Sequence, residues 1–299
     1  MSAAMPGPPL SEPGAHPARS FPTHLTSPEY KAPVEFLPLR CRVLEGNAML
    51  EVKGLCKYFG GIRAVDDCSF TAERGRITAL IGPNGAGKTT AFNCISKTMT
   101  PTAGEVWLEG VRIDQLRPHQ VTHLGLSRTF QITRNLEDLT VLENLIVQSK
   151  ITGWRSLFKP AIAPEEIDRA MEILDFLGIT RLAYEETRNL SYGQKKLMDF
   201  AAVLMSDPKI VLLDEPAGGV NPSLLAEIVD HIRKLNERGL TVLIVEHNME
   251  LVMSLSHKVV VMAAGRVIAE GPPEEVQADP MVLNAYLGAV PPKTEAAHA

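Results

Sequence analysis

The sequence has few cysteines, no long hydrophobic run and no excess of basic residues. Its 4 cysteines are too far apart for a paired metal knuckle, so isolated thiols in a reducing compartment are expected. The longest apolar runs, at 241–245 and 259–264, fall well short of the ~20 residues that span a bilayer, so no segment is expected to cross a membrane by itself. The net charge of −5 argues against nucleic acid as a direct partner.

Aliphatic residues are also scarce in the first 47 residues, which hold nine of the 22 prolines. Such a stretch cannot bury enough apolar surface to offset its ordering entropy, and it lacks the basic and apolar regions of a secretory signal. We expect a disordered proline-rich tail over residues 1–47 and a flexible tail over 289–299, with Met49 as an alternative start. Residues 48–288 are expected to form the folded domain, since the chain is 45% hydrophobic and 22% charged.

A glycine-rich stretch at 82–89, Gly-Pro-Asn-Gly-Ala-Gly-Lys-Thr, is the clearest motif. It follows the apolar run 77–81 and precedes a potential helix, which is the order of a P-loop. Glycines let backbone N–H groups converge on phosphate oxygens, and a helix N-terminus adds partial positive charge. Lys88 can reach the β- and γ-phosphates, and the Thr89 hydroxyl can coordinate Mg²⁺. The predicted nucleotide-binding residues are Gly82, Pro83, Asn84, Gly85, Ala86, Gly87, Lys88, Thr89 and Thr90.

Two later strands are predicted to end beside this loop. Residues 210–214 form an apolar run typical of a strand buried on both faces of a parallel sheet, where active sites lie at the carboxyl ends. Asp214 can support Mg²⁺ there, and Glu215 can orient and polarise the water that attacks the γ-phosphate. The strand expected at 241–245 brings the pair Glu246-His247 to the same edge.

Two further positions are compatible with an ordinary structural role as well as with nucleotide binding. One of two neighbouring aromatic residues, Phe59 or Tyr58, could stack on adenine or simply fill the core of a strand. Gln131 could hold a water or Mg²⁺ near the γ-phosphate, or it could be a surface side chain. By themselves these residues leave both interpretations open.

The segment 141–190 has helical periodicity, because apolar residues between 167 and 177 recur at spacings of three and four. Ser191 then offers an N-cap for the next helix, with Gln194 at its third position as in a capping box. By itself this stretch predicts a capped core helix. Short apolar pieces alternate with turns over 49–81, which predicts an antiparallel β-subdomain.

The order and spacing of these motifs resemble the nucleotide-binding subunit of ABC transporters, over roughly residues 49–288. The resemblance implies an α/β fold, with a P-loop NTPase (RecA-like) core, the antiparallel β-subdomain and a helical subdomain inserted at about 132–190. It also implies that ATP and Mg²⁺ bind. The implied catalytic residues are Glu215, His247 and Gln131. The implied metal ligands are Thr89, Gln131 and Asp214. The implied ATP contacts beyond the P-loop are Phe59, Ser191, Gly193 and Gln194.

One departure from the family's signature sequence indicates a particular branch of the family. The family signature usually has two glycines after its serine, whereas here Tyr192 precedes Gly193. This signature, the sequence Arg-Thr-Phe-Gln at 128–131, the run 215–222 and the sequence Asn-Ala-Tyr-Leu-Gly at 284–288 are most similar to the first of two ATPase subunits in branched-chain amino acid importers. Urea and amide importers share much of this pattern. We expect the Tyr192 ring to lie near the nucleotide of a partner subunit.

The resemblance also implies partners and a location. These are a second ATPase subunit in a heterodimer, two integral-membrane permease subunits and, indirectly, a solute-binding protein. The chain is expected at the cytoplasmic face of the inner membrane as a peripheral subunit. Binding of ATP would close the dimer and hydrolysis would reopen it, with the segment around Gln131 as the hinge next to the permease.

Two other classes share the P-loop. A soluble ABC ATPase of translation or DNA repair usually carries two cassettes or a long coiled coil, and the sequence shows neither. A P-loop kinase would transfer phosphate to an acceptor, but the signature at 190–194 argues against it. The sequence therefore favours a transport ATPase.

Overall fold

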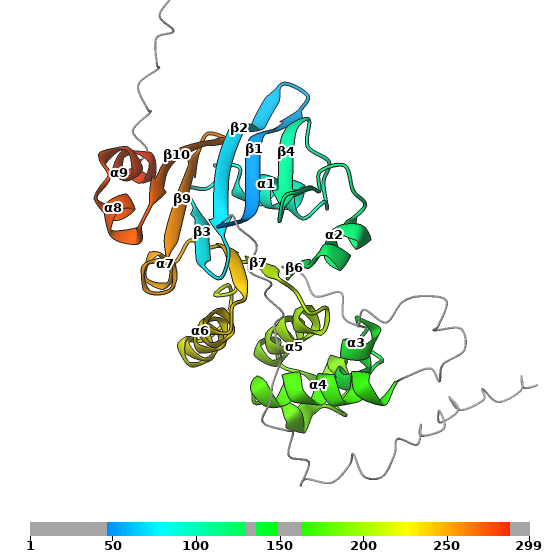
Figure 1. The fold of residues 1–299 in the computed structure, drawn as a ribbon. Helices are drawn as coiled ribbons and strands as arrows, with labels where there is room; N and C mark the ends of the chain where they lie inside the picture. The colour runs from blue at the N-terminus through cyan, green and yellow to red at the C-terminus, as the bar shows by residue number, and fades with distance from the viewer. Residues whose placement is uncertain (1–46, 130–135, 149–162, 288–299) are drawn as a thin grey trace, which may run out of the picture.

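The computed structural model describes residues 47–129, 136–148 and 163–287, and Figure 1 shows their arrangement. Two β-sheets lie together, and a group of helices packs below them. Each strand at the centre of the larger sheet contributes to two hydrophobic clusters. In strand β3 (Ile77–Ile81), Leu80 faces the cluster shared with the smaller sheet, whereas Ile77, Ala79 and Ile81 face the cluster shared with the helices. Burial on both faces explains why this strand contains only apolar residues besides Thr78.

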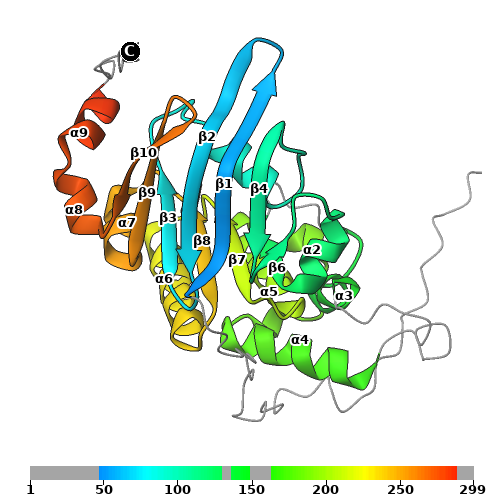
Figure 2. The ribbon, with the colours of Figure 1, turned by 45° about the horizontal axis from the view of Figure 1, so that its top comes forward.

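The smaller sheet is the predicted antiparallel β-subdomain, with strand order β2-β1-β4-β5. Strands β1 (Ala48–Phe59) and β2 (Ile62–Glu73) form the long hairpin that projects upward in Figure 2. They continue through the turns that the sequence suggested, because register shifts near residues 52–58 absorb the irregularities within one ladder. Strands β4 (Ala103–Leu108) and β5 (Val111–Arg112) complete the sheet.

The larger sheet has strand order β10-β9-β3-β8-β7-β6. Strands β3, β8 (Thr241–Val245) and β7 (Ile210–Asp214) pair in parallel, and all their residues are buried. Strands β6 (Leu126–Arg128) and β9 (Lys258–Ala263) extend the parallel part, and β10 (Arg266–Gly271) runs antiparallel to β9. Parallel pairing places the carboxyl ends of β3, β8 and β7 at one edge, which is where the predicted site residues follow.

Six of the described helices lie along the larger sheet. Helices α1 (Lys88–Ile95) and α2 (Pro118–Leu124) contribute to the cluster shared with the smaller sheet, and α6 (Pro222–Glu237), α7 (Met249–Leu255), α8 (Pro273–Ala278) and α9 (Pro280–Leu287) contribute to the other cluster. A second group contains the mutually packed helices α3 (Val141–Val147), α4 (Pro164–Phe176) and α5 (Tyr192–Met205), with short 3₁₀ turns at Thr180–Leu182 and Thr187–Asn189. Figure 1 shows this second group apart from α1. Helices α3 and α4 lie within the insertion expected at about 132–190, whereas α5 lies beyond that range and packs with them. We call these three helices the helical subdomain, and the bounds of the insertion stay a prediction.

Some predicted boundaries fall outside this description. The expected tails at 1–47 and 289–299 lie outside the described residues apart from Asn47, as does the expected start of the insertion at 132. These boundaries stay predictions. Within the described ranges, no helix combines the length and apolar character that a membrane span requires.

We predict that the packing of β4 on β1 depends on the missing side chain of Gly104. Its φ is +91°, and a Cβ there would lie 2.3 Å from the Gly54 carbonyl oxygen. Gly110 has φ +76°, but a Cβ there would meet nothing within 4 Å, so it is the matched control. Both alanine variants incur backbone strain of roughly 1–2 kcal/mol. Gly104→Ala should lose about 1–3 kcal/mol more of the free energy of unfolding in urea titrations, because the strands must separate. Equal losses in the two variants would contradict this account of the contact.

Candidate functional site

The P-loop is held between the two sheets. It follows β3 and leads directly into α1, so Lys88 and Thr89 occupy the first helical turn. A Cβ at Gly82 would lie 2.1 Å from the Met262 carbonyl oxygen, and one at Gly87 would lie 2.2 Å from the Ala64 carbonyl oxygen. Both glycines have positive φ, so steric contact and backbone conformation alike require glycine. The loop is therefore fixed in place for its backbone N–H groups to bind phosphate.

The Lys88 amine lies over this loop. Its Nζ donates to the carbonyl oxygens of Gly82 at 2.7 Å and Pro83 at 3.0 Å. Burial lowers the pKa of Lys88, and the negative charge of Glu215 partly offsets this effect. A partly desolvated ammonium group is well placed to interact with a phosphate, because its charge is less screened than in water.

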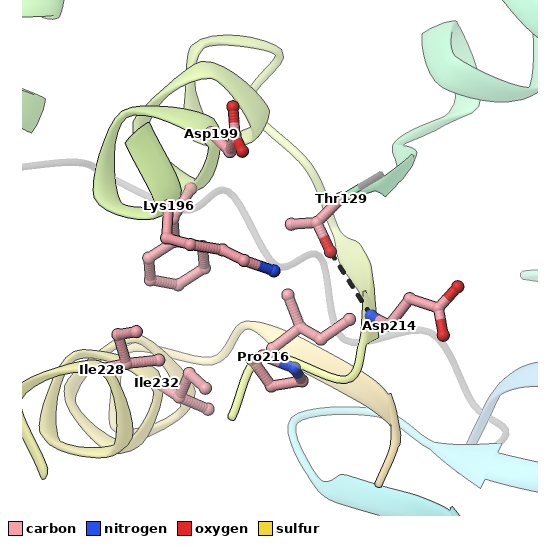
Figure 3. A pocket seen from close by; sticks show the side chains of 9 residues that line it. Thr129, Lys196, Asp199, Asp214, Pro216, Ile228 and Ile232 are labelled. Atoms are coloured by element: carbon pink, nitrogen blue, oxygen red, sulfur yellow. Dashed lines mark hydrogen bonds between the residues drawn. The ribbon is translucent and has the colours of Figure 1, made fainter. Parts of the chain in front are cut away.

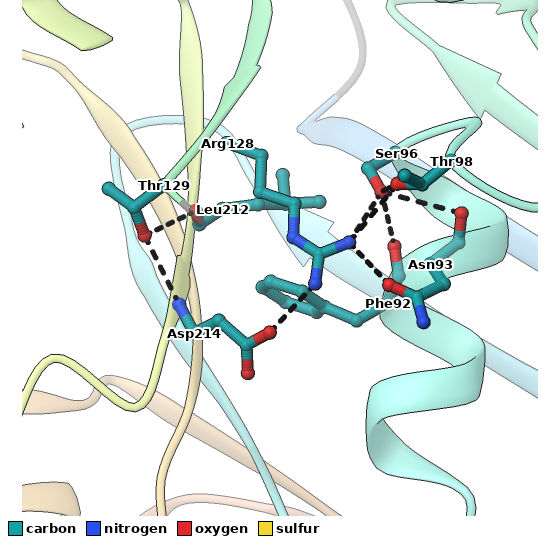
Figure 4. A network of polar contacts seen from close by, with 8 residues as sticks. All are labelled: Phe92, Asn93, Ser96, Thr98, Arg128, Thr129, Leu212 and Asp214. Carbon is teal, nitrogen blue, oxygen red and sulfur yellow. Dashed lines mark hydrogen bonds and ion pairs between the residues drawn. The ribbon is translucent and has the colours of Figure 1, made fainter. Parts of the chain in front are cut away.

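Asp214, at the end of β7, forms an ion pair with Arg128, whose role the sequence did not predict. Figure 4 shows Arg128, at the end of β6, between β7 and the end of α1. Its Nη2 donates to Asp214 Oδ2 at 2.7 Å, and the two side chains are 8% and 4% exposed. Its Nη1 donates to Asn93 Oδ1 at 2.6 Å and to Ser96 Oγ at 2.9 Å. The arginine thus neutralises Asp214 and connects it to the helix that begins at the P-loop.

Thr129 supports the same end of β7 from the next position. Its backbone N–H donates to the Leu212 carbonyl oxygen at 3.0 Å, and its Oγ1 accepts from the Asp214 N–H at 3.4 Å. Figure 3 shows Thr129 at a hollow between α5, α6 and the end of β7, with Lys196 directed into it. Gln131 follows two positions later, but residues 130–135 lie outside the described residues. Its role as hinge, catalytic residue or metal ligand stays a prediction.

Glu215 and His247 lie together at the sheet edge, as the sequence predicted. The Glu215 N–H donates to the Val245 carbonyl oxygen at 2.9 Å, which ties the residue after β7 to the end of β8. His247 Nδ1 lies 3.9 Å from Glu215 Oε1, and the two side chains are 65% and 32% exposed. Both can therefore meet a substrate. Glu215 also has φ +46°, an uncommon conformation for a residue with a side chain.

A buried carboxylate organises the two loops that carry these residues. Glu246 is fully buried at the end of β8. Its Oε1 accepts from the Ala217 N–H at 2.9 Å, and its Oε2 accepts from the N–H groups of His247 at 3.1 Å and Asn248 at 3.3 Å. The sequence placed Glu246 at this edge without giving it a role. An ionisable residue that directly follows the apolar run 242–245 was the available signal.

The two aromatic residues at the end of β1 have different surroundings. The Tyr58 hydroxyl donates to Asp66 Oδ1 at 2.9 Å, and Asp66 also accepts from Arg266 at 2.6 Å. Phe59 is 45% exposed, with the Lys57 amine 5.2 Å from its ring centroid. Since Tyr58 is held within the β-subdomain, Phe59 is the better candidate for stacking on adenine.

The signature residues form the capped start of α5. Ser191 Oγ accepts from the Gln194 N–H at 3.3 Å, and Gln194 Oε1 accepts from the Ser191 N–H at 2.8 Å, which is the predicted capping box. A Cβ at Gly193 would lie 2.5 Å from Leu224 Cδ2, so the glycine allows α5 to approach α6. These residues begin α5, which Figure 1 shows apart from α1, the helix that follows the P-loop.

The Tyr192 ring turns toward its own chain. Its hydroxyl donates to the Gly218 carbonyl oxygen at 3.1 Å. The expectation that this ring lies near a partner's nucleotide is not tested by the single chain, but the ring's observed contact is within the subunit.

The site provides hard oxygen ligands that suit Mg²⁺. The Thr89 hydroxyl lies in the first turn of α1, and Arg128 holds Asp214 through Oδ2, so Oδ1 is the oxygen that can face a cation or its water. Among the described residues, no group of three or more His, Cys, Asp or Glu side chains could hold a metal. This donor set fits a cation bound through one or two protein ligands and substrate phosphates, as is usual for Mg²⁺.

A P-loop, two carboxylates and a histidine at one sheet edge, with a capped signature helix on a separate subdomain, define an ATP-binding cassette. The ABC transporter family matches residues 65–218, and the chain belongs to this family. It is therefore an ATPase, and the predicted α/β P-loop fold is confirmed. The family described as branched-chain amino acid ATP-binding cassette transporter matches residues 266–290.

Individual relatives cover the whole cassette. The chain is 39% identical over 246 residues to the "Probable branched-chain amino acid transport ATP-binding protein LivG" of Archaeoglobus fulgidus, covering 81% of this chain and 96% of that protein. It is 39% identical over 249 residues to the high-affinity branched-chain amino acid transport ATP-binding protein LivG of Salmonella typhimurium, covering 80% and 98%. The crystal structure of the ADP conformation of an ATP-binding cassette of an ABC transporter is similar at TM-score 0.73 and 36% identity, covering 81% and 100%.

We predict that Arg128→Lys slows ATP hydrolysis while nucleotide binding in the absence of Mg²⁺ is retained. A lysine keeps the charge but cannot contact Asp214 and the end of α1 together, so the carboxylate loses its fixed position. Misplacing such a group can reduce turnover by roughly 10- to 100-fold. The matched control is Arg233→Lys, an exposed position on α6. Steady-state ATPase assays and fluorescent-nucleotide binding would show the difference, and equal turnover in both variants would refute the role of Arg128.

Proposed function

We propose that this chain is the ATP-hydrolysing subunit of an ABC importer for branched-chain amino acids. The observation that carries the substrate class is the match of residues 266–290 to the family described for these transporters, together with relatives that bear the same name. Urea and amide importers are the alternative suggested by the sequence, whereas the relatives named above are described as branched-chain amino acid transport proteins. The proposed location is the cytoplasmic face of the inner membrane, as a peripheral subunit.

The proposed chemistry uses residues that the two sheets bring to one edge. The P-loop N–H groups and Lys88 bind the phosphates and reduce their charge. Glu215 orients a water molecule and accepts its proton as the oxygen bonds to the γ-phosphorus, while the bond to the bridging oxygen breaks and ADP and phosphate result. His247 lies close enough to Glu215 to contact the same phosphate group. When bound, Mg²⁺ would neutralise phosphate charge, held by Thr89 and Asp214, with Gln131 expected to contribute.

A second ATPase subunit completes the proposed site. Ser191, Gly193 and Gln194 lie at the start of α5, which Figure 1 shows apart from α1, the helix that follows the P-loop. We infer that they face the nucleotide of the partner, and that the partner's signature covers the nucleotide held here. Backbone N–H groups in the first turn of a helix suit contact with phosphate where they have no partner within the helix. Because the sequence resembles the first of two ATPase subunits, we propose a partner of different sequence, and therefore a heterodimer.

The permease contact is proposed at a cleft between the two helix groups. This cleft has a volume of about 310 Å³ and lies between the end of α1, α2 and β6 on one side and α5 on the other. A segment of a membrane subunit inserted here would touch both parts, so rotation of the helical subdomain would move it. The lining residues that support this include Thr98, Val121, Leu126, Gln148, Val203 and Ser206.

The catalytic proposal predicts two different defects. Lys88→Ala should lose ATP binding, because the ammonium group that binds the phosphates is removed. Glu215→Gln should still bind ATP but hydrolyse it at least roughly 100-fold more slowly, since an amide cannot accept the proton from water. Nucleotide-binding and turnover assays on both variants check this. Near-normal turnover by Glu215→Gln would remove Glu215 from the water-activating role.

The assembly proposal predicts that the purified chain alone is mostly monomeric and hydrolyses ATP poorly, even with Mg²⁺. The rate of ATP hydrolysis should rise when the second ATPase subunit and the permease are added. Liposomes that contain the complex and a solute-binding protein should take up leucine. Light scattering of Glu215→Gln with ATP, ATPase assays and uptake of radiolabelled leucine measure these properties. A tight homodimer with full turnover unaided would overturn the heterodimer, and uptake of urea in place of leucine would overturn the substrate.

A further inference from the structure

Tyr192 links the signature helix to the loop that follows Glu215 in the same chain. Its hydroxyl donates to the Gly218 carbonyl oxygen at 3.1 Å. The ring also lies along Gly219, where a Cβ would be 3.1 Å from Tyr192 Cε1 and 3.2 Å from its hydroxyl oxygen. Although the side chain is 55% exposed, its polar end and one edge are therefore engaged with residues 218–219.

The loop that Tyr192 contacts controls the backbone of Glu215. The Gly218 N–H donates to the Glu215 carbonyl oxygen at 2.9 Å, so residues 215–218 form a tight turn. The Ala217 N–H is held by the buried Glu246 carboxylate at 2.9 Å. The Tyr192 hydroxyl donates its hydrogen bond to the carbonyl oxygen of Gly218, whose N–H group is the one bound to Glu215. The loop is thus fixed from the sheet by Glu246 and from the helical subdomain by Tyr192.

The backbone at Glu215 needs this support. Its φ of +46° is unfavourable for a residue with a side chain, so the conformation persists only where neighbouring contacts maintain it. Gly219, at φ +72°, supplies the space for the tyrosine ring and a backbone that can pass beneath it. Loss of a contact to this turn would let Glu215 relax away from the position it holds.

We propose that Tyr192 is a positioning residue whose hydroxyl, through Gly218, sets the placement of Glu215 in its own chain. Movement of the start of α5 would then shift the carboxylate of Glu215. The helix end that presents Ser191 and Gly193 to a partner would thus also position the turn beside the nucleotide of its own chain. This inference rests on the proposed role of Glu215. It gives the tyrosine a function within the subunit that a glycine at this position could not supply.

The test compares Tyr192→Phe with Tyr184→Phe in the assembled transporter complex. Tyr192→Phe keeps the ring and removes only the donor to Gly218, whereas Tyr184 is a tyrosine of the same subdomain outside this contact. A lost hydrogen bond of ordinary strength corresponds to a fall in kcat of roughly 2- to 10-fold. We expect this fall in Tyr192→Phe with an unchanged KM for ATP, and no change in Tyr184→Phe. Unchanged kcat in Tyr192→Phe, or a raised KM with unchanged kcat, would overturn the proposal.

A double variant separates this inference from the proposed function. If Tyr192 acts through Glu215, adding Tyr192→Phe to Glu215→Gln should cause no further loss in the residual hydrolysis rate, because the two residues act as one unit. An equal fold-loss in both backgrounds would show that the hydroxyl acts elsewhere and would overturn the inference while the role of Glu215 stands. Full turnover by Glu215→Gln alone would instead refute the role of Glu215 on which the inference depends.

Discussion

The nucleotide site depends on the parallel pairing of β3, β8 and β7. These strands are buried on both faces, between the antiparallel sheet and the helices, so their register is fixed by packing on two sides. Their carboxyl ends consequently meet at one edge, and each continues into a loop with a different task. The P-loop follows β3, the pair Asp214-Glu215 ends β7, and Glu246-His247 follows β8. Any disturbance of this pairing would separate the phosphate-binding loop from the groups that act on the phosphate.

Buried charges convert that shared edge into a defined geometry. Arg128 neutralises Asp214 and links it to the end of α1. Glu246 accepts hydrogen bonds from three backbone N–H groups in two loops. Breaking a buried pair by removing one partner costs about 3–5 kcal/mol, because the remaining charge has no compensation. These interactions therefore fix positions strongly even if they add little net stability. They explain how exposed groups such as Glu215 and His247 can be held for chemistry without being buried themselves.

The helical subdomain presents a second functional surface that a single chain cannot use on its own nucleotide. The capped start of α5 is exposed and separate from the P-loop, which suits contact with another subunit. The cleft beside β6 and α5 lies between the same two parts of the molecule. A relative movement of these parts would change the signature, the cleft and the turn after Glu215 together. That common mechanical element connects ATP chemistry with the proposed transport function.

The sequence by itself determined the features that depend on local patterns. The glycines of the P-loop, the apolar runs of β3, β7 and β8, and the capping box at Ser191 all follow from neighbouring residues, and their structures agree with the predictions. The family and its ATPase class followed from the order of these motifs, and the comparisons confirm both. The long β1–β2 hairpin was only partly predicted, because its bulges interrupt the alternation of apolar residues.

Only the tertiary structure decided which distant side chains support the site. Arg128 and Asp214 are 86 positions apart, Ala217 and Glu246 are 29 apart, and Tyr192 and Gly218 are 26 apart. No local propensity specifies such pairs, since each side chain would be equally acceptable as a surface charge or an exposed ring at its own position. The contacts arise because parallel strands and packed helices bring their ends together, and the low dielectric of that edge then favours paired charges and satisfied hydrogen bonds.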